Sequence, residues 1–283
     1  MSDYIGVFER KEVKYVLSAS QYQRFRVLMD SYMRVDDYGE TRINSLYFDT
    51  PQRELIERSL DKPLYKEKLR MRWYERLAQD ELDRLPAESA DTVFIELKKK
   101  FKGIVYKRRL SCARKAAQAY LAKTHTYEEA VRAFPLDVYT LEDTELTARS
   151  VQIAREIDAF CTRWENLCPS MLISCNRIAL TLKEQFASEE NVRITFDSRL
   201  VYQDLALSGG EALSSTQRPI LDPTCVVMEI KVAGPYPLWL VEALDECDIR
   251  PQSFSKYGEA YKQSGKVRLL SENVLVREEE RCA

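Results

Sequence analysis

The stretch Tyr65-Lys66-Glu67-Lys68-Leu69-Arg70-Met71-Arg72-Trp73-Tyr74 alternates between charge and apolarity. Every second position from Lys66 to Arg72 is lysine or arginine, whereas the alternate positions from Leu69 to Trp73 are apolar. Successive side chains of a β-strand point to opposite faces of a sheet. The stretch therefore predicts a strand with one cationic face and one apolar face. The cationic face is either solvated, as in an ordinary half-buried strand, or it lines an enclosed site.

The composition of the chain excludes a molecule that is basic overall. Its 283 residues are 45% hydrophobic and 31% charged, which is typical of a globular protein with a sizeable core. Lysine and arginine number 43 against 45 acidic residues, so the formal net charge is -2. A nucleic-acid binder with an overall positive charge is therefore excluded, and any strong positive field must be local. We expect residues 1–283 to form a single domain.

Cysteine and histidine usage limits the chemistry that the chain can perform. Seven cysteines are scattered without a Cys-x-x-Cys pair, which indicates reduced thiols instead of a disulfide framework or a zinc site. His125 is the only histidine, which excludes histidine-ligated metals and almost all histidine-based catalysis. No apolar run approaches the roughly 18 residues of a membrane span, and the N-terminus shows no signal pattern. We therefore expect a cytoplasmic protein.

The alternation of the opening stretch recurs along the chain. Strands are predicted at residues 7–17, 42–49, 65–74, 93–99, 104–110, 171–184, 191–197 and 225–232. Helices are predicted at residues 21–33, 52–60 and 237–246, near 259–262, and within a helical section about 112–168. The sequence Asp36-Asp37-Tyr38-Gly39 is typical of a turn, and a frayed tail is expected about 271–283.

The helices between these strands need an apolar surface to pack against. If the sheet closes into a barrel, its apolar faces pack on outer helices and its charged faces line the lumen. If the sheet stays open, the charged faces are merely solvated. The interspersed helices favour the first arrangement. We therefore predict an α+β fold, an antiparallel β-barrel tunnel with helices packed outside.

The charged faces of the predicted strands are strongly cationic. They carry Lys14, Lys66, Lys68, Arg70, Arg72, Lys98, Lys107, Arg109, Arg177, Lys183, Arg193 and Lys231, together with the acids Glu12, Glu96, Asp197 and Glu229. Two like charges about 6 Å apart repel by roughly 3 kcal/mol at an effective dielectric near 20. So many cations in one tunnel need counter-anions, and a linear chain of phosphates suits arginine forks and lysine point charges best. Nucleic acid fits less well, since few aromatic side chains share these faces for base stacking.

The acids on these faces allow two interpretations. Glu12, Glu96 and Glu229 could hold Mg²⁺ or Mn²⁺, which prefer carboxylate and phosphate oxygens. Alternatively, each carboxylate could be a salt-bridge partner that holds neighbouring cations in place. Metal binding is expected first of all at Glu229.

The charged strands contain a set of short segments that is specific as an ordered group, although each segment alone is weak. The set consists of Lys11-Glu12-Val13-Lys14-Tyr15, Ser45-Leu46-Tyr47-Phe48-Asp49-Thr50, Lys68-Leu69-Arg70-Met71-Arg72-Trp73-Tyr74, Ile95-Glu96-Leu97-Lys98, Lys107-Arg108-Arg109, Arg177, Val192-Arg193-Ile194-Thr195-Phe196-Asp197, Met228-Glu229-Ile230-Lys231 and Phe254-Ser255-Lys256-Tyr257. In this order these segments resemble the polyphosphate polymerase domain of vacuolar transporter chaperone proteins, a branch of the triphosphate tunnel metalloenzymes (CYTH-like superfamily).

The resemblance implies a tunnel of antiparallel strands whose cations bind phosphate. The implied phosphate ligands are Lys14, Lys68, Arg70, Arg72, Lys98, Lys107, Arg109, Arg177, Arg193, Lys231 and Lys256. The implied catalytic residues among them are Lys14, Arg70, Arg72, Arg193 and Lys231. Glu229 is the implied principal metal ligand, with Mn²⁺ or Mg²⁺ as cofactor. The family member with this activity transfers the terminal phosphoryl group of ATP to a growing polyphosphate chain and releases ADP.

The expected partners follow from that activity: ATP and inorganic polyphosphate, triphosphate or pyrophosphate. The matching segments begin almost at residue 1, so we expect the phosphate-sensing domain that precedes them in eukaryotic members to be absent. We expect no membrane span in this chain. Export of the product would then require a separate membrane partner.

Three activities remain open at this point. Phosphoryl transfer needs positioning and charge neutralisation more than acid–base chemistry, and an ionised phosphate acceptor needs no general base. An inorganic or nucleoside triphosphatase would instead need a water molecule oriented by Glu12 or Glu96. A polyphosphate-binding subunit without turnover has no need of Glu229, so the presence of this residue favours catalysis. A polymerase is therefore the first prediction, with the triphosphatase and the binding subunit as alternatives.

Overall fold

The computed structural model describes residues 11–77, 91–102, 104–136, 146–186, 192–205 and 216–265. The frayed tail predicted about 271–283 lies outside these residues, and so does the start of the strand predicted at 7–17.

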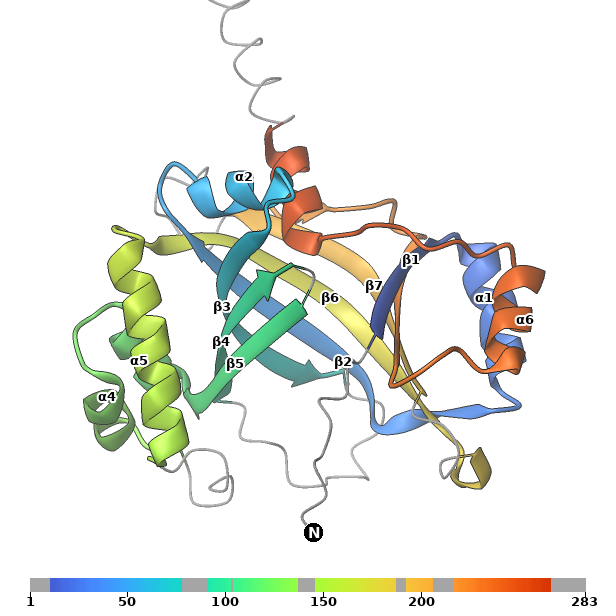
Figure 1. Cartoon of the computed structure of the whole chain (residues 1–283), viewed down its shortest axis with the longest axis horizontal. Helices are drawn as coiled ribbons and strands as arrows, with labels where there is room; N and C mark the ends of the chain where they lie inside the picture. Colours follow the sequence, from blue (N-terminus) through green and yellow to red (C-terminus); the bar gives the residue numbers. More distant parts are fainter. Residues whose placement is uncertain are drawn as a thin grey trace, which may run out of the picture. The chain divides into compact units, whose positions relative to one another are not determined.

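The described strands form one nine-stranded sheet (Figure 1). Its order is β1-β9-β7-β6-β2-β3-β4-β5, and the short β8 pairs with β7. The pairs β1/β9, β9/β7, β3/β4 and β4/β5 are antiparallel. Within the described residues, β1 and β5 are the two edge strands, so the sheet is open between them. The predicted barrel therefore describes this sheet only loosely. The predicted α+β class is confirmed.

The element bounds agree with most of the predicted ranges. The strands are β1 (Lys11–Leu17), β2 (Met33–Asp49), β3 (Tyr65–Arg76), β4 (Thr92–Phe101), β5 (Ile104–Ala113), β6 (Cys168–Leu182), β7 (Val192–Asp204), β8 (Arg218–Pro219) and β9 (Val226–Val232). The helices are α1 (Ala19–Met29), α2 (Glu54–Leu60), α3 (Arg114–Leu121), α4 (Tyr127–Ala133), α5 (Ala148–Arg163), the 3-10 turn η2 (Glu184–Phe186), α6 (Leu238–Glu246) and a last helix at 256–265.

The chain divides into two compact units. The first comprises Met1–Arg42, Cys175–Leu200 and Leu221–Ser255. The second comprises Ile43–Ser174, Val201–Ile220 and Lys256–Ala283. The strands β2, β6 and β7 continue from one unit into the other. The expectation of a single domain over residues 1–283 stays a prediction.

In the first unit, helices α1 and α6 pack against the apolar faces of the strands (Figure 1). Leu17 on β1, Phe25 on α1, Phe196 on β7 and Leu240 on α6 are all buried in one cluster. Helix α1 begins at a capping box formed by Ser18, which satisfies backbone donors that the first turn would leave unpaired. The core of this unit therefore lies between the sheet and its helices.

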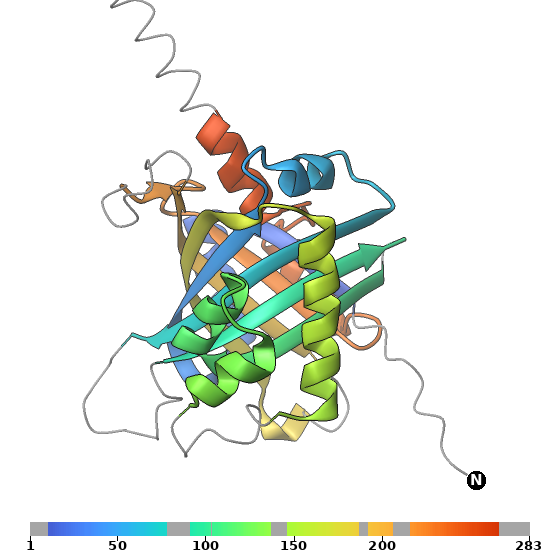
Figure 2. The same cartoon turned by 90° about the vertical axis from the view of Figure 1, so that its left-hand side faces the viewer.

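In the second unit, helices α3, α4 and α5 cover the apolar face of β3, β4 and β5 (Figure 2). Ile95 on β4 and Phe160 on α5 are fully buried there. Leu69 and Met71 belong to the same cluster, and Trp73 packs against it. The apolar face predicted for the opening stretch is thus the face that meets the helices, and the alternate side chains carry their charges away from this core.

The predicted turn at residues 36–39 is wrong, because β2 runs without interruption from Met33 to Asp49. The local turn signals are nonetheless present. The backbone N–H of Tyr38 donates to Asp36 Oδ1 at 3.2 Å, and Gly39 has a φ of 61°. A glycine with positive φ inside a strand is typical of a bulge, which accommodates turn geometry while the strand continues. The pairing of β2 overrides the local signal.

Two expectations from composition can be compared with the described residues. No disulfide joins any of the six cysteines that the structure describes. Among the described helices, none is both long and apolar enough to cross a membrane.

Candidate functional site

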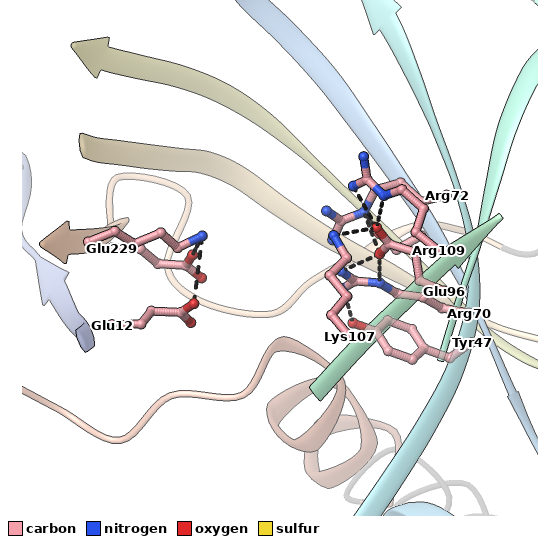
Figure 3. Close-up of polar contacts among 10 residues, drawn as sticks. Glu12, Tyr47, Arg70, Arg72, Glu96, Lys107, Arg109 and Glu229 are labelled. Carbon is pink, nitrogen blue, oxygen red and sulfur yellow. Dashed lines mark hydrogen bonds and ion pairs between the residues drawn. The ribbon is translucent and has the colours of Figure 1, made fainter. Parts of the chain in front are cut away.

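The cationic faces of three neighbouring strands meet at one buried carboxylate. The strands β3, β4 and β5 pair so that Arg70, Glu96 and Arg109 lie in one row across the sheet. Directly opposite residues on paired strands point to the same face, so their side chains are neighbours. Figure 3 shows the resulting group, which we call the Glu96 cluster: Arg70, Arg72, Glu96, Lys107 and Arg109.

The two carboxylate oxygens of Glu96 are shared among four cations. Arg70 donates from Nε at 2.7 Å and approaches from Nη2 at 2.6 Å, both to Oε2. Lys107 Nζ lies 2.7 Å and Arg109 Nη2 lies 2.6 Å from Oε1. Arg72 Nε lies 3.9 Å from Oε2. A metal ion at Glu96 would have to displace these donors, so the salt-bridge interpretation fits this residue better than metal ligation.

The Glu96 cluster carries a strong positive field. Burial would raise the pKa of Glu96, but the charges of Arg70, Arg72 and Lys107 outweigh it and hold that pKa well below its usual range. Burial also lowers the pKa of Lys107, although Glu96 opposes this. Four cations around one carboxylate leave a formal charge of +3 in the cluster. The side chains of Lys107 and Arg109 are 43% and 39% exposed, so an incoming anion can reach them.

Two further side chains from β2 contact the Glu96 cluster. Arg70 Nη1 donates to Tyr47 Oη at 3.1 Å, and Arg72 Nε donates to Ser45 Oγ at 3.2 Å. Burial would raise the pKa of Tyr47, but the charges of Arg70, Arg72 and Lys68 lower it to about 8. The sequence alone assigned no role in this site to Tyr47. The signal that could have placed it is parity, because Ser45 and Tyr47 alternate along their strand on the charged face.

A buried network holds Tyr257 against Tyr47. Their rings stack with centres 4.5 Å apart. Tyr257 Oη donates to Asp49 Oδ2 at 2.8 Å, and Lys68 Nζ lies 5.7 Å from the centre of the Tyr257 ring. Lys256 directly precedes Tyr257, so the same network fixes the backbone that carries this predicted phosphate ligand.

A pocket of about 700 Å³ lies beside β5. Lys107 and Arg109 line it, together with Phe94 on β4 and with Arg149 and Ser150 on α5. The guanidinium carbon of Arg109 lies 4.5 Å from the centre of the Phe94 ring, and this cation–π contact helps to hold the arginine in place. A ligand in the pocket would therefore contact two of the four cations that surround Glu96.

In the first unit, β1 and β9 bring two glutamates and two lysines together. The register pairs Glu12 with Lys231 and Lys14 with Glu229. Lys14 Nζ lies 3.7 Å from Glu12 Oε1 and 3.4 Å from Glu229 Oε1. Lys231 Nζ lies 3.6 Å from Glu12 Oε2 and 3.9 Å from Glu229 Oε2. Figure 3 shows the carboxylates of Glu12 and Glu229 close together, and we call them the Glu12–Glu229 pair.

The Glu12–Glu229 pair has donor chemistry suited to a hard divalent cation. Mg²⁺ sites that handle phosphates commonly use one or two carboxylates and take their other oxygens from phosphate and water. On β7, Thr195 is directly opposite Glu229, and its Oγ1 is buried without a hydrogen-bond partner among the described residues. Nowhere in the described part of the chain do three acidic, cysteine or histidine side chains gather in a way that could hold a metal ion. The protein would therefore supply two carboxylates and a hydroxyl.

The two other predicted arginines of the first unit pair with acids. Arg177 on β6 donates from Nε and Nη2 to the two oxygens of Asp197 at 2.6 and 2.7 Å. Burial would lower the pKa of Arg177, but the charges of Asp197 and Glu229 raise it. Arg193 on β7 contacts Asp36 at 3.0 Å and is directly opposite Lys231. Its side chain is 56% exposed, so this arginine is open to an added ligand.

The structure thus gathers the predicted phosphate ligands in groups within each unit. Arg70, Arg72, Lys107 and Arg109 meet at Glu96, and Lys68 lies beside Tyr257. Lys14 and Lys231 meet at the Glu12–Glu229 pair, and Arg177 feels the charge of Glu229. Phosphate binding by these residues, and by Lys98 and Lys256, stays a prediction.

Known proteins resemble this chain at two levels. The chain is 24% identical over 248 residues to vacuolar transporter chaperone complex subunit 4 from Trypanosoma brucei brucei (strain 927/4 GUTat10.1). That match covers 80% of this chain but 30% of the relative, so the chain spans less than a third of the relative's length.

Among solved structures, the protein HpAC1 from Hippeastrum, described as having a dominant triphosphatase activity, is 11% identical, with a TM-score of 0.44. That alignment covers 89% of this chain and 95% of HpAC1. The protein PH1819 from Pyrococcus horikoshii OT3 is 12% identical, with a TM-score of 0.41 over 90% of this chain and 99% of PH1819. Both likenesses are loose and concern only the arrangement of strands and helices.

The family model decides the assignment, because it spans nearly the whole chain. The model of the VTC domain matches residues 9–264, a range that includes every strand and helix described above except the end of the last helix. Both the Glu96 cluster and the Glu12–Glu229 pair fall within it. The chain therefore belongs to the VTC domain family.

Proposed function

We propose that this protein is a polyphosphate polymerase that transfers the terminal phosphoryl group of ATP to a growing chain of inorganic polyphosphate. The observation that carries the proposal is the Glu96 cluster, in which four cations share one carboxylate. A purely structural ion-pair network would tend to balance its charges, because excess like charge is costly at short range. The excess here suits a ligand with closely spaced negative charges, such as polyphosphate or the triphosphate of ATP.

The arginines and lysines position phosphate groups and neutralise them. Arg70 and Arg72 present planar guanidinium groups that match phosphate oxygens two at a time, whereas Lys107 offers a point charge. Glu96 and Tyr47 hold the guanidinium of Arg70 in place before a substrate arrives. Phosphoryl transfer depends mainly on such positioning and on electrostatic stabilisation. The acceptor oxygen of a polyphosphate end is already ionised, so the reaction needs no general base.

We assign the metal site to Glu229 and Glu12, with the hydroxyl of Thr195 beside them. When bound, Mg²⁺ or Mn²⁺ neutralises negative charge on phosphate oxygens. Lys14 and Lys231 lie between 3.4 and 3.9 Å from the two carboxylates, which is longer than a tight ion pair. Both lysines can therefore turn toward phosphate without breaking a short hydrogen bond.

The family assignment supports the proposal. The Trypanosoma relative is named as a subunit of a vacuolar transporter chaperone complex, which supports action together with other chains. We propose that this chain acts in the cytoplasm on ATP and polyphosphate. Export of the product would use a separate membrane partner.

The deciding experiment is one incubation of the purified protein with ATP and Mn²⁺. The products are resolved on a gel with a polyphosphate stain, and ADP and free phosphate are measured in parallel. Long chains together with ADP are the expected result. Free phosphate without chains would identify a triphosphatase. Tight polyphosphate binding without turnover would identify a binding subunit.

A pair of arginine variants tests the residue assignment. Arg70→Ala should weaken tripolyphosphate binding more than tenfold, because a hydrogen bond to a charged group contributes roughly 1.5–3 kcal/mol. Arg108→Ala is the matched control, since Arg108 points to the opposite face of β5 and contacts Glu156 on α5 at 2.9 Å. Isothermal titration calorimetry measures both affinities. An Arg70→Ala variant that binds as tightly as Arg108→Ala would contradict the assignment.

A further inference from the structure

A group of exposed apolar side chains lies at one end of β3, β4 and β5 in the second unit. These side chains, which we call the apolar tip, are Leu64, Tyr65, Phe101, Ile104, Val105 and Tyr106. Their exposed fractions lie between 42% and 71%. Single exposed apolar residues are normal on protein surfaces, whereas a contiguous group of them marks an interaction surface.

Strand pairing brings most of the apolar tip together on one face of the sheet, whereas Val105, directly opposite Lys100, points to the other face. The register places Tyr65 opposite Phe101, and Phe101 opposite Ile104, so these three side chains form one row across the sheet. The ring centres of Tyr65 and Phe101 are 6.4 Å apart. The backbone N–H of Lys102 donates to the carbonyl of Leu64 at 2.9 Å, which brings Leu64 alongside. Figure 2 shows the neighbouring ends of β4 and β5 projecting past α5, so this helix does not cover them.

Four lysines accompany the apolar tip: Lys62, Lys66, Lys100 and Lys102. Lys66 and Lys100 are direct cross-strand neighbours and point to the sheet face opposite Tyr65 and Phe101. Burial, together with the charges of Lys100 and Lys62, lowers the pKa of Lys66. Lys102 Nζ lies 5.5 Å from the centre of the Phe101 ring. Like charges directly opposite each other destabilise a sheet, so this arrangement suits a surface that meets negative charge from outside.

We propose that the apolar tip and its four lysines form a docking surface for an anionic phospholipid membrane. The interfacial layer of such a membrane accepts aromatic and aliphatic side chains, and its headgroups attract lysines. A second copy of the chain would meet the tip with the same positive charges. Free polyphosphate would neutralise the lysines but leave the apolar side chains in water. A membrane surface would accommodate both the apolar side chains and the lysines. This inference does not depend on the polymerase activity.

The test is co-sedimentation of the purified protein with phospholipid vesicles. Binding is expected to vesicles of phosphatidylcholine mixed with phosphatidylserine, to weaken strongly with phosphatidylcholine alone, and to decline as salt is added. The double variant Phe101→Ser with Ile104→Ser should reduce binding roughly tenfold or more. The double variant Lys62→Glu with Lys102→Glu should reduce it about 25-fold or more, since each basic side chain near an anionic surface contributes roughly fivefold.

Matched controls come from exposed residues outside the tip. Val27→Ser on α1 and Lys115→Glu on α3 should bind vesicles as the wild type does. Circular dichroism checks that each variant is folded. The proposal is overturned if the wild-type protein does not sediment with the phosphatidylserine vesicles, or if both tip variants bind as tightly as their controls. Dimerisation that Phe101→Ser abolishes, without vesicle binding, would also overturn it and identify a second copy as the partner.

Discussion

The substitution Glu96→Gln removes the negative charge around which four cations are arranged, while it keeps the shape of the side chain. The side chain of Glu96 is 1% exposed and lies 2.6 to 2.7 Å from donors of Arg70, Lys107 and Arg109. After the substitution, these cations repel one another without a buried counter-charge. We therefore expect the variant to be less stable than the wild type and to depend on an added polyanion.

The size of the effect follows from the exposure of the cations. Removing one partner of a buried ion pair costs about 3–5 kcal/mol when the other charge stays buried. The side chains of Lys107 and Arg109 are 43% and 39% exposed, so water screens part of their charge. We therefore expect a loss of about 2–3 kcal/mol in the free energy of unfolding. For a chain of this size the melting temperature should fall by roughly 3–5 °C.

The assay is thermal unfolding with and without tripolyphosphate. Phosphate oxygens can replace the missing carboxylate charge, so tripolyphosphate should raise the melting temperature more in Glu96→Gln than in the wild type. Glu156→Gln is the matched control, because Glu156 contacts Lys99 and Arg108 at 3.0 and 2.9 Å but is 25% exposed. This control should lose at most about 1 kcal/mol. A Glu96→Gln variant as stable as the wild type, or one with the same tripolyphosphate response, would refute the reasoning.

The pH dependence of stability gives the same prediction a second readout. The pKa of Glu96 in the folded protein is lowered from an ordinary value of 4.5. The unfolded chain therefore takes up a proton at this group at a higher pH than the folded protein does. The stability that Glu96 contributes is present above pH 4.5 and is lost progressively as the pH falls below it. Glu96→Gln should flatten this acid limb of the stability curve.

Three other substitutions test the residues around the two sites. Tyr47→Phe should abolish a phenolate absorbance step near pH 8. Because the pKa of Tyr47 is lowered from 10.0, the stability that its ionisation contributes is present above pH 10 and is lost as the pH falls toward 8. Between pH 8 and pH 10 the free energy of unfolding of the wild type should therefore rise by about 2–3 kcal/mol relative to the variant. An unchanged titration would contradict this. Thr195→Val removes a buried hydroxyl without a partner among the described residues, so stability should hold or rise by up to about 1 kcal/mol. The Mn²⁺ concentration for half-maximal activity should nevertheless increase, and an unchanged value would remove Thr195 from the metal site. Tyr257→Phe loses the hydroxyl contacts to Asp49 and Ser170, which should cost about 1–3 kcal/mol in urea unfolding. Its ring stack with Tyr47 remains, so weaker tripolyphosphate binding without destabilisation would count against a structural role.

Local periodicity was sufficient to predict most strands and the faces that they present. Leu69 and Met71 are buried against helices, and Arg70 and Arg72 point the other way, because side-chain direction in a strand repeats every two residues wherever the strand lies. The turn predicted at residues 36–39 was wrong because local patterns do not include long-range strand pairing. Turn chemistry there is also local, but the pairing of β2 with its neighbours overrides it.

The sequence by itself determined which charged side chains lie opposite the apolar core, and the ordered segments determined the family. Only the tertiary structure decided which of these charges meet. Glu96 joins Arg70 and Arg109 because two strand registers align residues 26 and 13 positions apart, and Asp49 meets Tyr257 across 208 positions. Glu229 instead comes next to a second carboxylate, Glu12, through shared lysines. The physical reason is that a strand's alternation fixes the face of a charge, whereas long-range pairing selects the partner that neutralises it.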